Sequence, residues 1–308
     1  MSVATDSEQK LLDLNGVAVV DTFAEAFPMT GTRLIVTADS LRWARQAGAE
    51  FSGNATSVIA CDLETAIERD LKPAETPDGR PGVSILAFAF NKKGLEKGVV
   101  NRVGQCLLTC PTSACFNGLP GVEKDQKINV GGQIRFFGDG YQSSKKLGDR
   151  RFWRIPVMDG EFLCEERFGT VKGVGGGNLI IAANSAKNAL VAAENAARQI
   201  RTKPDVILPF PGGIVRSGSK VGSKYKALKA STNHEYCPTL RGQVALKIPA
   251  AARAVYEIVI DGLSADAVAT AMRAGLHAAA SCTGVLQVTA GNYGGKLGPH
   301  HFHLREML

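Results

Sequence analysis

The chain has 308 residues, of which 44% are hydrophobic and 21% charged, a composition typical of a globular protein with about two domains. The formal net charge of +7 favours acidic partners, but the cations are scattered and aromatic residues make up only 6%, which argues against a dedicated nucleic-acid surface. We expect no membrane span, because no apolar run is long enough to cross a bilayer. The polar N-terminal residues lack the apolar core of a signal peptide, so we expect a cytoplasmic protein whose seven cysteines are reduced.

The first elements in chain order are two strands and a helix. GVAVVD (16–21) predicts a short strand, and TFAEAF (22–27) predicts a turn or an edge segment. RLIVTADS (33–40) predicts an apolar strand that ends in a helix-capping signature, with Asp39 or Ser40 capping the helix that follows. Further strands are predicted at IRFFGDG (134–140) and GVLQVTAG (284–291).

Three segments of the first half recur in the same order in the second half. NLIIAANS (178–185) matches RLIVTADS, and DGEFLCEE (159–166) resembles NGVAVVD (15–21); GVSILAFAF (82–90) with its helix parallels VYEIVIDGL (255–263) with its helix. This order predicts an α+β fold of two ferredoxin-like α/β sandwich lobes related by internal duplication, against the alternative of coincidence between ordinary strand–helix units. We place the lobes at 1–155 and 156–308, with a loop inserted in the second at about 208–235.

The segment LPFPGGIVRSGSKVGSKY (208–225) is the most unusual stretch of the chain. Its prolines and paired glycines predict a specific loop whose backbone can approach a ligand, and its spaced cations suit carboxylate or phosphate. The alternative is a solvated basic loop. The candidate anion-binding residues are Gly212, Gly213, Arg216, Ser219, Lys220, Ser223 and Lys224.

Glu257 lies in VYEIVI (255–260), a run that is apolar on both alternating faces. A carboxyl group buried in such a strand is expected to have a raised pKa and to be suited to general acid/base catalysis. The alternative is a structural ion pair with an Arg or Lys.

Other polar motifs have weaker interpretations. Arg80, between Gly79 and Pro81, could clamp a carboxylate or be a solvated loop residue, and Asp139 between two glycines could bind substrate or only shape a turn. Cys106, Cys110 and Cys115 do not have iron–sulfur spacing, and GVGGGN (173–178) precedes a strand, unlike a dinucleotide fingerprint. A metal site is not expected at the terminal histidines His300, His301 and His303, which lack an accompanying Cys or carboxylate.

Nine motifs together resemble the formylmethanofuran:tetrahydromethanopterin formyltransferase family, over about residues 14–308: LPFPGGIVRSGSKVGSKY, ASTNHEYCPT, VYEIVIDG, AGNYGGKLG, DTFAEAF, ETPDGRPGV, GQCLLT, FFGDGYQ and RIPVMDGEF. The resemblance implies two ferredoxin-like lobes, a homotetramer and no prosthetic group. It implies formyl transfer between a ring nitrogen of tetrahydromethanopterin and the primary amine of methanofuran or an analogue, both carriers having acidic groups. It further implies Glu257 as acid/base, Asn292 in substrate binding, and partner subunits of a hydrolase complex in methylotrophic bacteria.

Three other functions remain open at this point. The chain could be a catalytically idle scaffold that binds the carriers for a hydrolase, although Glu257 and the glycine-rich loop are intact. It could be a metal-dependent formamide hydrolase that uses the C-terminal histidines. An RNA-binding module is the third, but the aromatic signature of such modules is missing.

Overall fold

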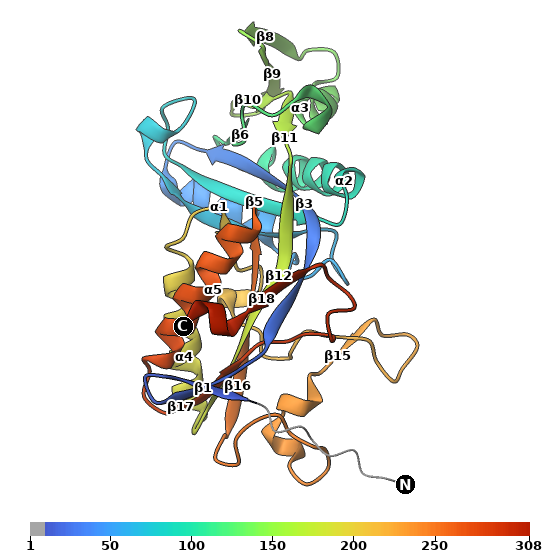
Figure 1. Ribbon diagram of the computed structural model, residues 1–308. Helices are drawn as coiled ribbons and strands as arrows, with labels where there is room; N and C mark the ends of the chain where they lie inside the picture. The colour runs from blue at the N-terminus through green and yellow to red at the C-terminus, as the bar shows by residue number, and fades with distance from the viewer. Residues whose placement is uncertain (1–9) are drawn as a thin grey trace.

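The computed structural model describes residues 10–308, which fold into two lobes joined by two long strands (Figure 1). The strands of the first lobe's sheet, in chain order, are β3 (Phe23–Thr37), β4 (Glu64–Leu71), β5 (Gly82–Ala89), β6 (Ala114–Asn117), β8 (Ser143–Leu147), β9 (Arg150–Val157) and β10 (Gly160–Glu165). Those of the second are β1 (Leu11–Leu14), β2 (Val17–Val20), β12 (Val171–Ala183), β13 (Val206–Ile207), β16 (Ala254–Gly262) and β17 (Val285–Thr289).

The two lobes repeat one topology, which confirms the predicted pair of ferredoxin-like lobes. In the first lobe, β3, β4, β5 and β6 lie in the order β6-β3-β5-β4, and every adjacent pair is antiparallel. In the second, β12, β13, β16 and β17 lie in the equivalent order β17-β12-β16-β13, again antiparallel. Helices connect the same positions in each lobe: α1 (Leu41–Ser52) and α2 (Lys92–Arg102), then α4 (Ala186–Ile200) and α5 (Ala265–Ala280).

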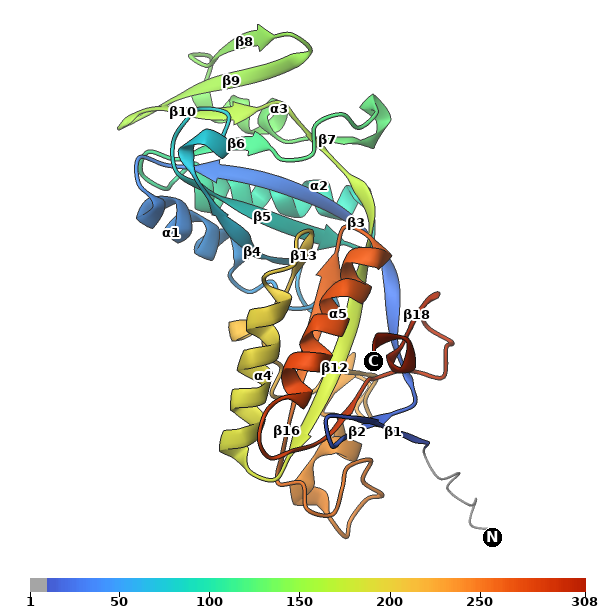
Figure 2. The ribbon, with the colours of Figure 1, turned by 60° about the vertical axis from the view of Figure 1, so that its left-hand side comes forward.

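Local capping explains where these helices begin. Ser40 and Ser185 each accept a hydrogen bond from the backbone N–H three residues later, at 3.4 and 3.1 Å. Because a hydroxyl at this position satisfies an otherwise free N–H group, the repeated strand–Ser–helix motif forms the same structure twice. Small residues such as Ala44, Ala192 and Ala271 lie in the apolar cores of the two lobes. Figure 2 shows α4 and α5 lying along the sheet of the second lobe.

Each lobe takes its fifth strand from the other half of the chain. β2 pairs in parallel with β17 of the second lobe, and β10 pairs in parallel with β6 of the first. These are the two segments whose sequences resemble each other at 15–21 and 159–166. The predicted boundary near residue 155 divides the chain into two halves, but each half contributes one strand to the lobe of the other. The boundary therefore remains a prediction.

β3 and β12 form the connection between the lobes. Residues 27–31 of β3 pair with 171–175 of β12, while the rest of each strand belongs to one lobe (Figure 2). The prediction of a turn or edge segment at 22–27 was wrong, because Phe23 begins this strand and pairs with β18 (His300–His303). The predicted strand at 134–140 was also wrong. It contains the end of α3 (Gly131–Ile134) and a 3-10 turn, Arg135–Gly138.

The loop inserted in the second lobe lies between β13 and β16, and it extends to residue 253 rather than ending near 235. It contains the hairpin of β14 (Lys220–Val221) and β15 (Ala230–Ser231). Val215 pairs with Glu257 by two backbone hydrogen bonds, of 2.7 and 3.1 Å, so the loop is attached to the edge of β16. The remaining short elements are β7 (Lys127–Asn129), β11 (Arg167–Gly169), a π-helical turn (Val103–Leu107) and 3-10 turns at Pro73–Glu75, Lys124–Gln126, Pro211–Gly213, His234–Tyr236, Pro238–Leu240 and Leu304–Met307.

Candidate active site

A cavity of about 610 Å³ runs from the junction of the lobes along the face of β16 that lies under the inserted loop. Its wall includes Phe27 and Met29 of β3, Val259 of β16, and Phe210 from the loop. A cavity of this size, with an apolar lining and a few polar groups, is typical of a small-molecule site.

Two glycines of β12 make room for this cavity. The ladder between β12 and β16 shifts register between Val174 and Gly177, where Gly176 has a φ of +90°. A Cβ on Gly175 would lie 2.1 Å from the sulfur of Met29. The glycine-rich segment GVGGGN (173–178) therefore contains a β-bulge. The bulge bends β12 and leaves a hollow beside the lobe junction.

Glu257 lies on β16 and lines the cavity, with 5% of its surface exposed. Ser219 Oγ donates a hydrogen bond to Glu257 Oε1 at 2.6 Å, and Oε2 has no hydrogen-bond partner among residues 10–308. Burial raises the pKa of Glu257 to about 7, and the hydrogen bonds from Ser219 only partly oppose that rise. A carboxyl group with this pKa can gain and lose a proton near neutral pH, as an acid/base catalyst must.

Two lysines of the inserted loop line the cavity on the same side as Glu257. Lys220 Nζ donates to Nδ1 of His234 at 3.2 Å, while Lys247 forms a 2.9 Å ion pair with Glu235. Burial raises the pKa of the neighbouring Tyr236 to about 12, which keeps its hydroxyl protonated. This end of the cavity therefore combines positive charge with neutral hydrogen-bonding groups.

A turn after β17 forms the opposite wall. Asn292 Nδ2 donates to Thr22 Oγ1 at 2.9 Å and to the Phe23 carbonyl at 3.2 Å, and Asn178 holds Gly291 in the same wall by hydrogen bonds of 2.6 and 3.2 Å. Asn292 thus lines the cavity with its amide group engaged by the start of β3.

A pair of acidic groups, Glu64 and Asp261, closes the cavity at the lobe junction. Glu64 of β4 lines the cavity and faces Asp261 of β16, which is fully buried, about 13 Å along the strand from Glu257. Burial and the neighbouring Glu64 charge raise the pKa of Asp261 well above its ordinary range. Val58 N donates to Glu64 Oε1 and Gly176 N donates to Asp261 Oδ1, while Asp261 Oδ2 has no hydrogen-bond partner among residues 10–308. Because burial raises the pKa of both carboxyl groups, we infer that the pair shares a proton.

This pair predicts a pH-dependent stability. The pKa of Asp261 is higher in the folded than in the unfolded protein. The stability that protonated Asp261 contributes is therefore fully present below its unfolded-state pKa and is lost as pH rises through its folded-state pKa. Asp261→Asn keeps a donor toward Glu64 without a titrating proton. We expect its unfolding temperature at pH 8 to exceed that of the wild type by roughly 2–6 °C, and the difference to shrink toward pH 4.

Circular dichroism melts across this pH range measure the effect, with the exposed Asp125→Asn as control. A parallel pH dependence of wild type and Asp261→Asn would mean that the two carboxyl groups do not share a proton.

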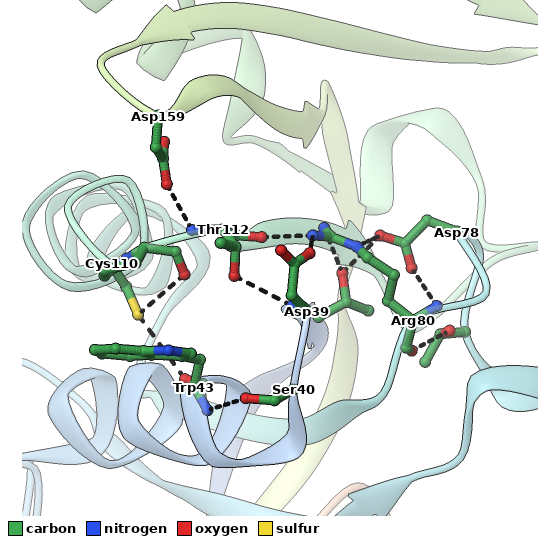
Figure 3. Close-up of polar contacts among 11 residues, drawn as sticks. Asp39, Ser40, Trp43, Asp78, Arg80, Cys110, Thr112 and Asp159 are labelled. Atoms are coloured by element: carbon green, nitrogen blue, oxygen red, sulfur yellow. Dashed lines mark hydrogen bonds and ion pairs between the residues drawn. The ribbon is translucent and has the colours of Figure 1, made fainter.

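Arg80 lies in the first lobe and does not line the cavity. Figure 3 shows its guanidinium between Asp39 and Asp78, at 3.0 and 2.9 Å, with Nη1 also donating to the Thr112 carbonyl at 2.5 Å. Nη2 donates to Thr37 at the end of β3, eight residues beyond Met29, so this cluster is roughly 25 Å from the junction end of the cavity. Within one chain its guanidinium ties three segments of the first lobe together.

The other predicted residues are divided among several places. Ser219, Lys220 and Asn292 join Glu257 around the cavity. Gly212 lines a different cavity of about 530 Å³, and Arg216 lines a small hollow of about 30 Å³ beyond Glu257. Gly213 is buried in a turn, and neither Ser223 nor the exposed Lys224 lines the main cavity, while Asp139 ends a turn of the first lobe with a φ of +50°. Their proposed roles in binding remain predictions.

Sequence reasoning missed several polar residues that line this cavity, among them Glu25, Glu64, Tyr236, Lys247 and Tyr293. Glu25 stands between Ala24 and Ala26 and has the same signal as Glu257, a carboxylate inside an apolar run. The interpretation of 22–27 as a turn or edge segment hid that signal. Glu64 had no comparable signal, because its partner Asp261 is distant in the sequence.

The C-terminal histidines pack against an aromatic side chain. His301 and His303 pack on Phe23, with ring centroids 4.7 and 5.2 Å away, and residues 10–308 contain no group of three His, Cys, Asp or Glu side chains arranged to hold one metal ion. Nor does any helix in this range combine the length and hydropathy that crossing a membrane would need.

Comparisons with known proteins agree with this architecture. A family model described as "Formylmethanofuran-tetrahydromethanopterin formyltransferase" matches residues 12–157, and one described as "FTR, proximal lobe" matches 160–307. A formylmethanofuran--tetrahydromethanopterin formyltransferase of Methylococcus capsulatus is 58% identical, over 96% of this chain and 99% of that protein. A subunit of the formyltransferase/hydrolase complex from Methylorubrum extorquens is 54% identical, over 96% of this chain and 97% of that protein.

Solved structures of related proteins share the fold. The formyltransferase/hydrolase complex of Methylorubrum extorquens, crystallised with methylofuran, superposes with a TM-score of 0.93 at 52% identity, covering 97% of this chain and 99% of the matched one. The formyltransferase of Methanosarcina barkeri superposes with a TM-score of 0.91 at 47% identity, covering 96% and 100%.

Proposed function

The chain belongs to the formylmethanofuran–tetrahydromethanopterin formyltransferase family, and on that basis we propose that Glu257 transfers the proton while a formyl group passes between the two carriers. The chain is an enzyme of formyl transfer whose substrates are tetrahydromethanopterin and a methanofuran. The observation that carries the proposal is a carboxyl group, 5% exposed and hydrogen-bonded to Ser219, at the wall of the main cavity, where burial raises its pKa to about 7.

The reaction needs little covalent chemistry from the protein. In the direction toward methanofuran, the primary amine of that carrier attacks the formyl carbon, and a tetrahedral intermediate forms. The attacking nitrogen must then lose a proton and the departing ring nitrogen must gain one, which a single carboxyl group of matched pKa can do in turn. No side-chain nucleophile is needed, because the amine is itself the nucleophile, and the apolar wall helps to exclude water that would hydrolyse the formyl group.

Purified protein should transfer formyl groups without any partner subunit. The assay follows formyl-tetrahydromethanopterin in the presence of methanofuran, with the formate released as a measure of hydrolysis. Absence of transfer by the isolated, folded chain would favour the idle scaffold. Release of formate together with one tightly bound zinc per chain would favour the metal-dependent hydrolase.

Lys220 is the predicted anion-binding lysine that lies on the cavity wall, and we expect it to hold an acidic tail of a carrier. Lys220→Ala should raise KM for that carrier by about 5- to 30-fold, with less than a 3-fold change in kcat, because a contact to a remote group stabilises ground and transition states alike. Steady-state kinetics with each carrier in turn measure this effect.

Lys224→Ala is the matched control, since Lys224 belongs to the same loop but is exposed and does not line the cavity. The KM increase for Lys220→Ala should also diminish at high salt, where the attraction is screened. Equal KM values in wild type and Lys220→Ala for both carriers would exclude the anion-binding role.

We further propose that the enzyme assembles as a homotetramer, with partner subunits of a hydrolase complex as a second mode of association. Large apolar side chains are exposed on the first lobe, where Phe136 and Phe137 are about two-thirds exposed and Tyr141 is 83% exposed. A patch of this kind favours a protein partner. Arg80 and Asp139 lie in this lobe, so any contact of theirs with substrate would involve the cavity of a neighbouring copy. Light scattering of the purified chain tests the assembly.

The cytoplasm remains the predicted location. All seven cysteines are free thiols, as expected in a reducing compartment.

A further inference from the structure

A second carboxylate, Glu25, organises the wall opposite the inserted loop. It lies on β3 with 1% of its surface exposed. Oε2 accepts from the backbone N–H groups of Tyr293 and Gly295 at 2.6 and 3.0 Å, and Oε1 accepts from those of Leu297 and Gly298 at 2.5 and 2.7 Å. Burial would raise the pKa of Glu25, but these four donors outweigh it and hold the pKa below its ordinary value.

This arrangement determines the path of 293–298, a segment without helix or strand. Four N–H groups that point at one charged side chain leave the segment few alternative conformations. Both Gly294 and Gly295 have a φ near +70°, which allows the backbone to turn around the carboxylate. Glu25 therefore fixes the backbone of this segment by accepting the hydrogen bonds of its N–H groups.

The segment presents Tyr293 to the inserted loop. The Tyr293 hydroxyl donates to the Ser219 carbonyl at 3.1 Å and accepts from Val221 N at 3.0 Å. Ser219 and Val221 flank Lys220, and the three residues lie between Gly218 and Gly222, which have φ values of +75° and +87°. One hydroxyl thus ties both ends of a short segment that is bounded by two glycines.

Ser219 completes the connection, because its hydroxyl donates to Oε1 of Glu257 at 2.6 Å. We propose that Glu25 and Tyr293 are positioning residues for formyl transfer, which hold Ser219 against Glu257 and Lys220 at the cavity wall. The inference rests on the proposed role of Glu257. The position of Glu257 on β16 is thus stabilised by Glu25 of β3 and by Tyr293 of the segment 293–298.

This support predicts a change in pH dependence as well as in rate. The Ser219 hydrogen bond favours the charged form of Glu257, so a loosened Ser219 should let the pKa of Glu257 rise. A purely structural role of Tyr293 would change stability and leave that pKa in place. The pH profile of kcat therefore distinguishes the two roles.

Tyr293→Phe tests the proposal, because it removes only the hydroxyl. We expect kcat to fall by about 5- to 30-fold, and the limb of the kcat profile that vanishes in Glu257→Gln to shift upward by about half a pH unit or more. KM should rise as well, since Lys220 is released. Tyr225→Phe is the control: Tyr225 lies in the inserted loop, is 73% exposed and should behave as the wild type.

Three further variants keep the test decisive. Ser219→Ala should reproduce the shift of the pH limb, and the Ser219→Ala/Tyr293→Phe double variant should show little additional shift, as expected for residues that act in series. Glu25→Gln should resemble Tyr293→Phe, with thermal melts confirming that it folds. A wild-type profile for Tyr293→Phe, when Glu257→Gln is inactive, would overturn the positioning role alone. An active Glu257→Gln would instead overturn the proposed function.

Discussion

Replacing Glu257 by glutamine is expected to lower kcat for formyl transfer by about 10²–10⁴-fold, the usual contribution of a positioned acid/base group. Glutamine has nearly the same shape and can still accept a hydrogen bond from Ser219 Oγ through its amide oxygen. It cannot take up and return a proton. Stopped or continuous assays with saturating carriers measure the loss, and KM for each carrier should change far less than kcat.

The same substitution makes a prediction about stability. The folded-state pKa of Glu257, about 7, lies above the ordinary value of 4.5, so the wild type loses stability as pH rises through this interval. Glu257→Gln lacks that loss and should unfold at an equal or higher temperature than the wild type at pH 8. Low activity is then not a consequence of unfolding.

Glu235→Gln is the matched control for Glu257→Gln, because Glu235 also lines the cavity but is paired with Lys247 and has a side chain that is 38% exposed. We expect less than a 10-fold loss of kcat from it, as for a group that does not carry the proton. Near-normal turnover by Glu257→Gln would remove this residue from the mechanism. The basis for a pH limb near 7 would then also be lost.

Arg33→Met is expected to destabilise the protein by about 3 kcal/mol, the largest effect that we predict on folding. Arg33 of β3 binds Glu68 of β4 at 2.8 Å and Asp205, in the loop before β13, at 2.5 Å. The Glu68 side chain is only 5% exposed, so removal of the guanidinium leaves a carboxylate buried without its cation. Methionine retains the apolar stem, which isolates the loss of charge.

This variant should show how strongly the lobes depend on each other, because Asp205 belongs to the second lobe. Urea unfolding measures the free energy, and Arg45→Met provides the control. Arg45 is paired with Asp70 on the surface, where both side chains are about half exposed, and its loss should destabilise the protein far less than the loss of Arg33. An equal small cost for both substitutions would mean that the junction ion pair contributes no more than a surface pair.

Much of the fold could be predicted because its signals are local. The helix caps at Ser40 and Ser185 need only a hydroxyl followed by three helical residues, so the repeated strand–helix units were recognisable in both halves. Burial of Glu257 followed from the apolar residues on either side of it, and the structure leaves it 5% exposed. The same argument applied to Glu25 would have located a second buried carboxylate.

What the sequence by itself determined is therefore the strand–helix units repeated in the two halves and the burial of Glu257. Only the tertiary structure decided that β2 and β10 exchange lobes, that Glu64 meets Asp261, and that Lys220 rather than Lys224 faces the cavity. The physical reason is the range of the interactions. A cap or an apolar strand depends on neighbours within a few residues, whereas pairing between distant segments depends on the packing of the whole chain.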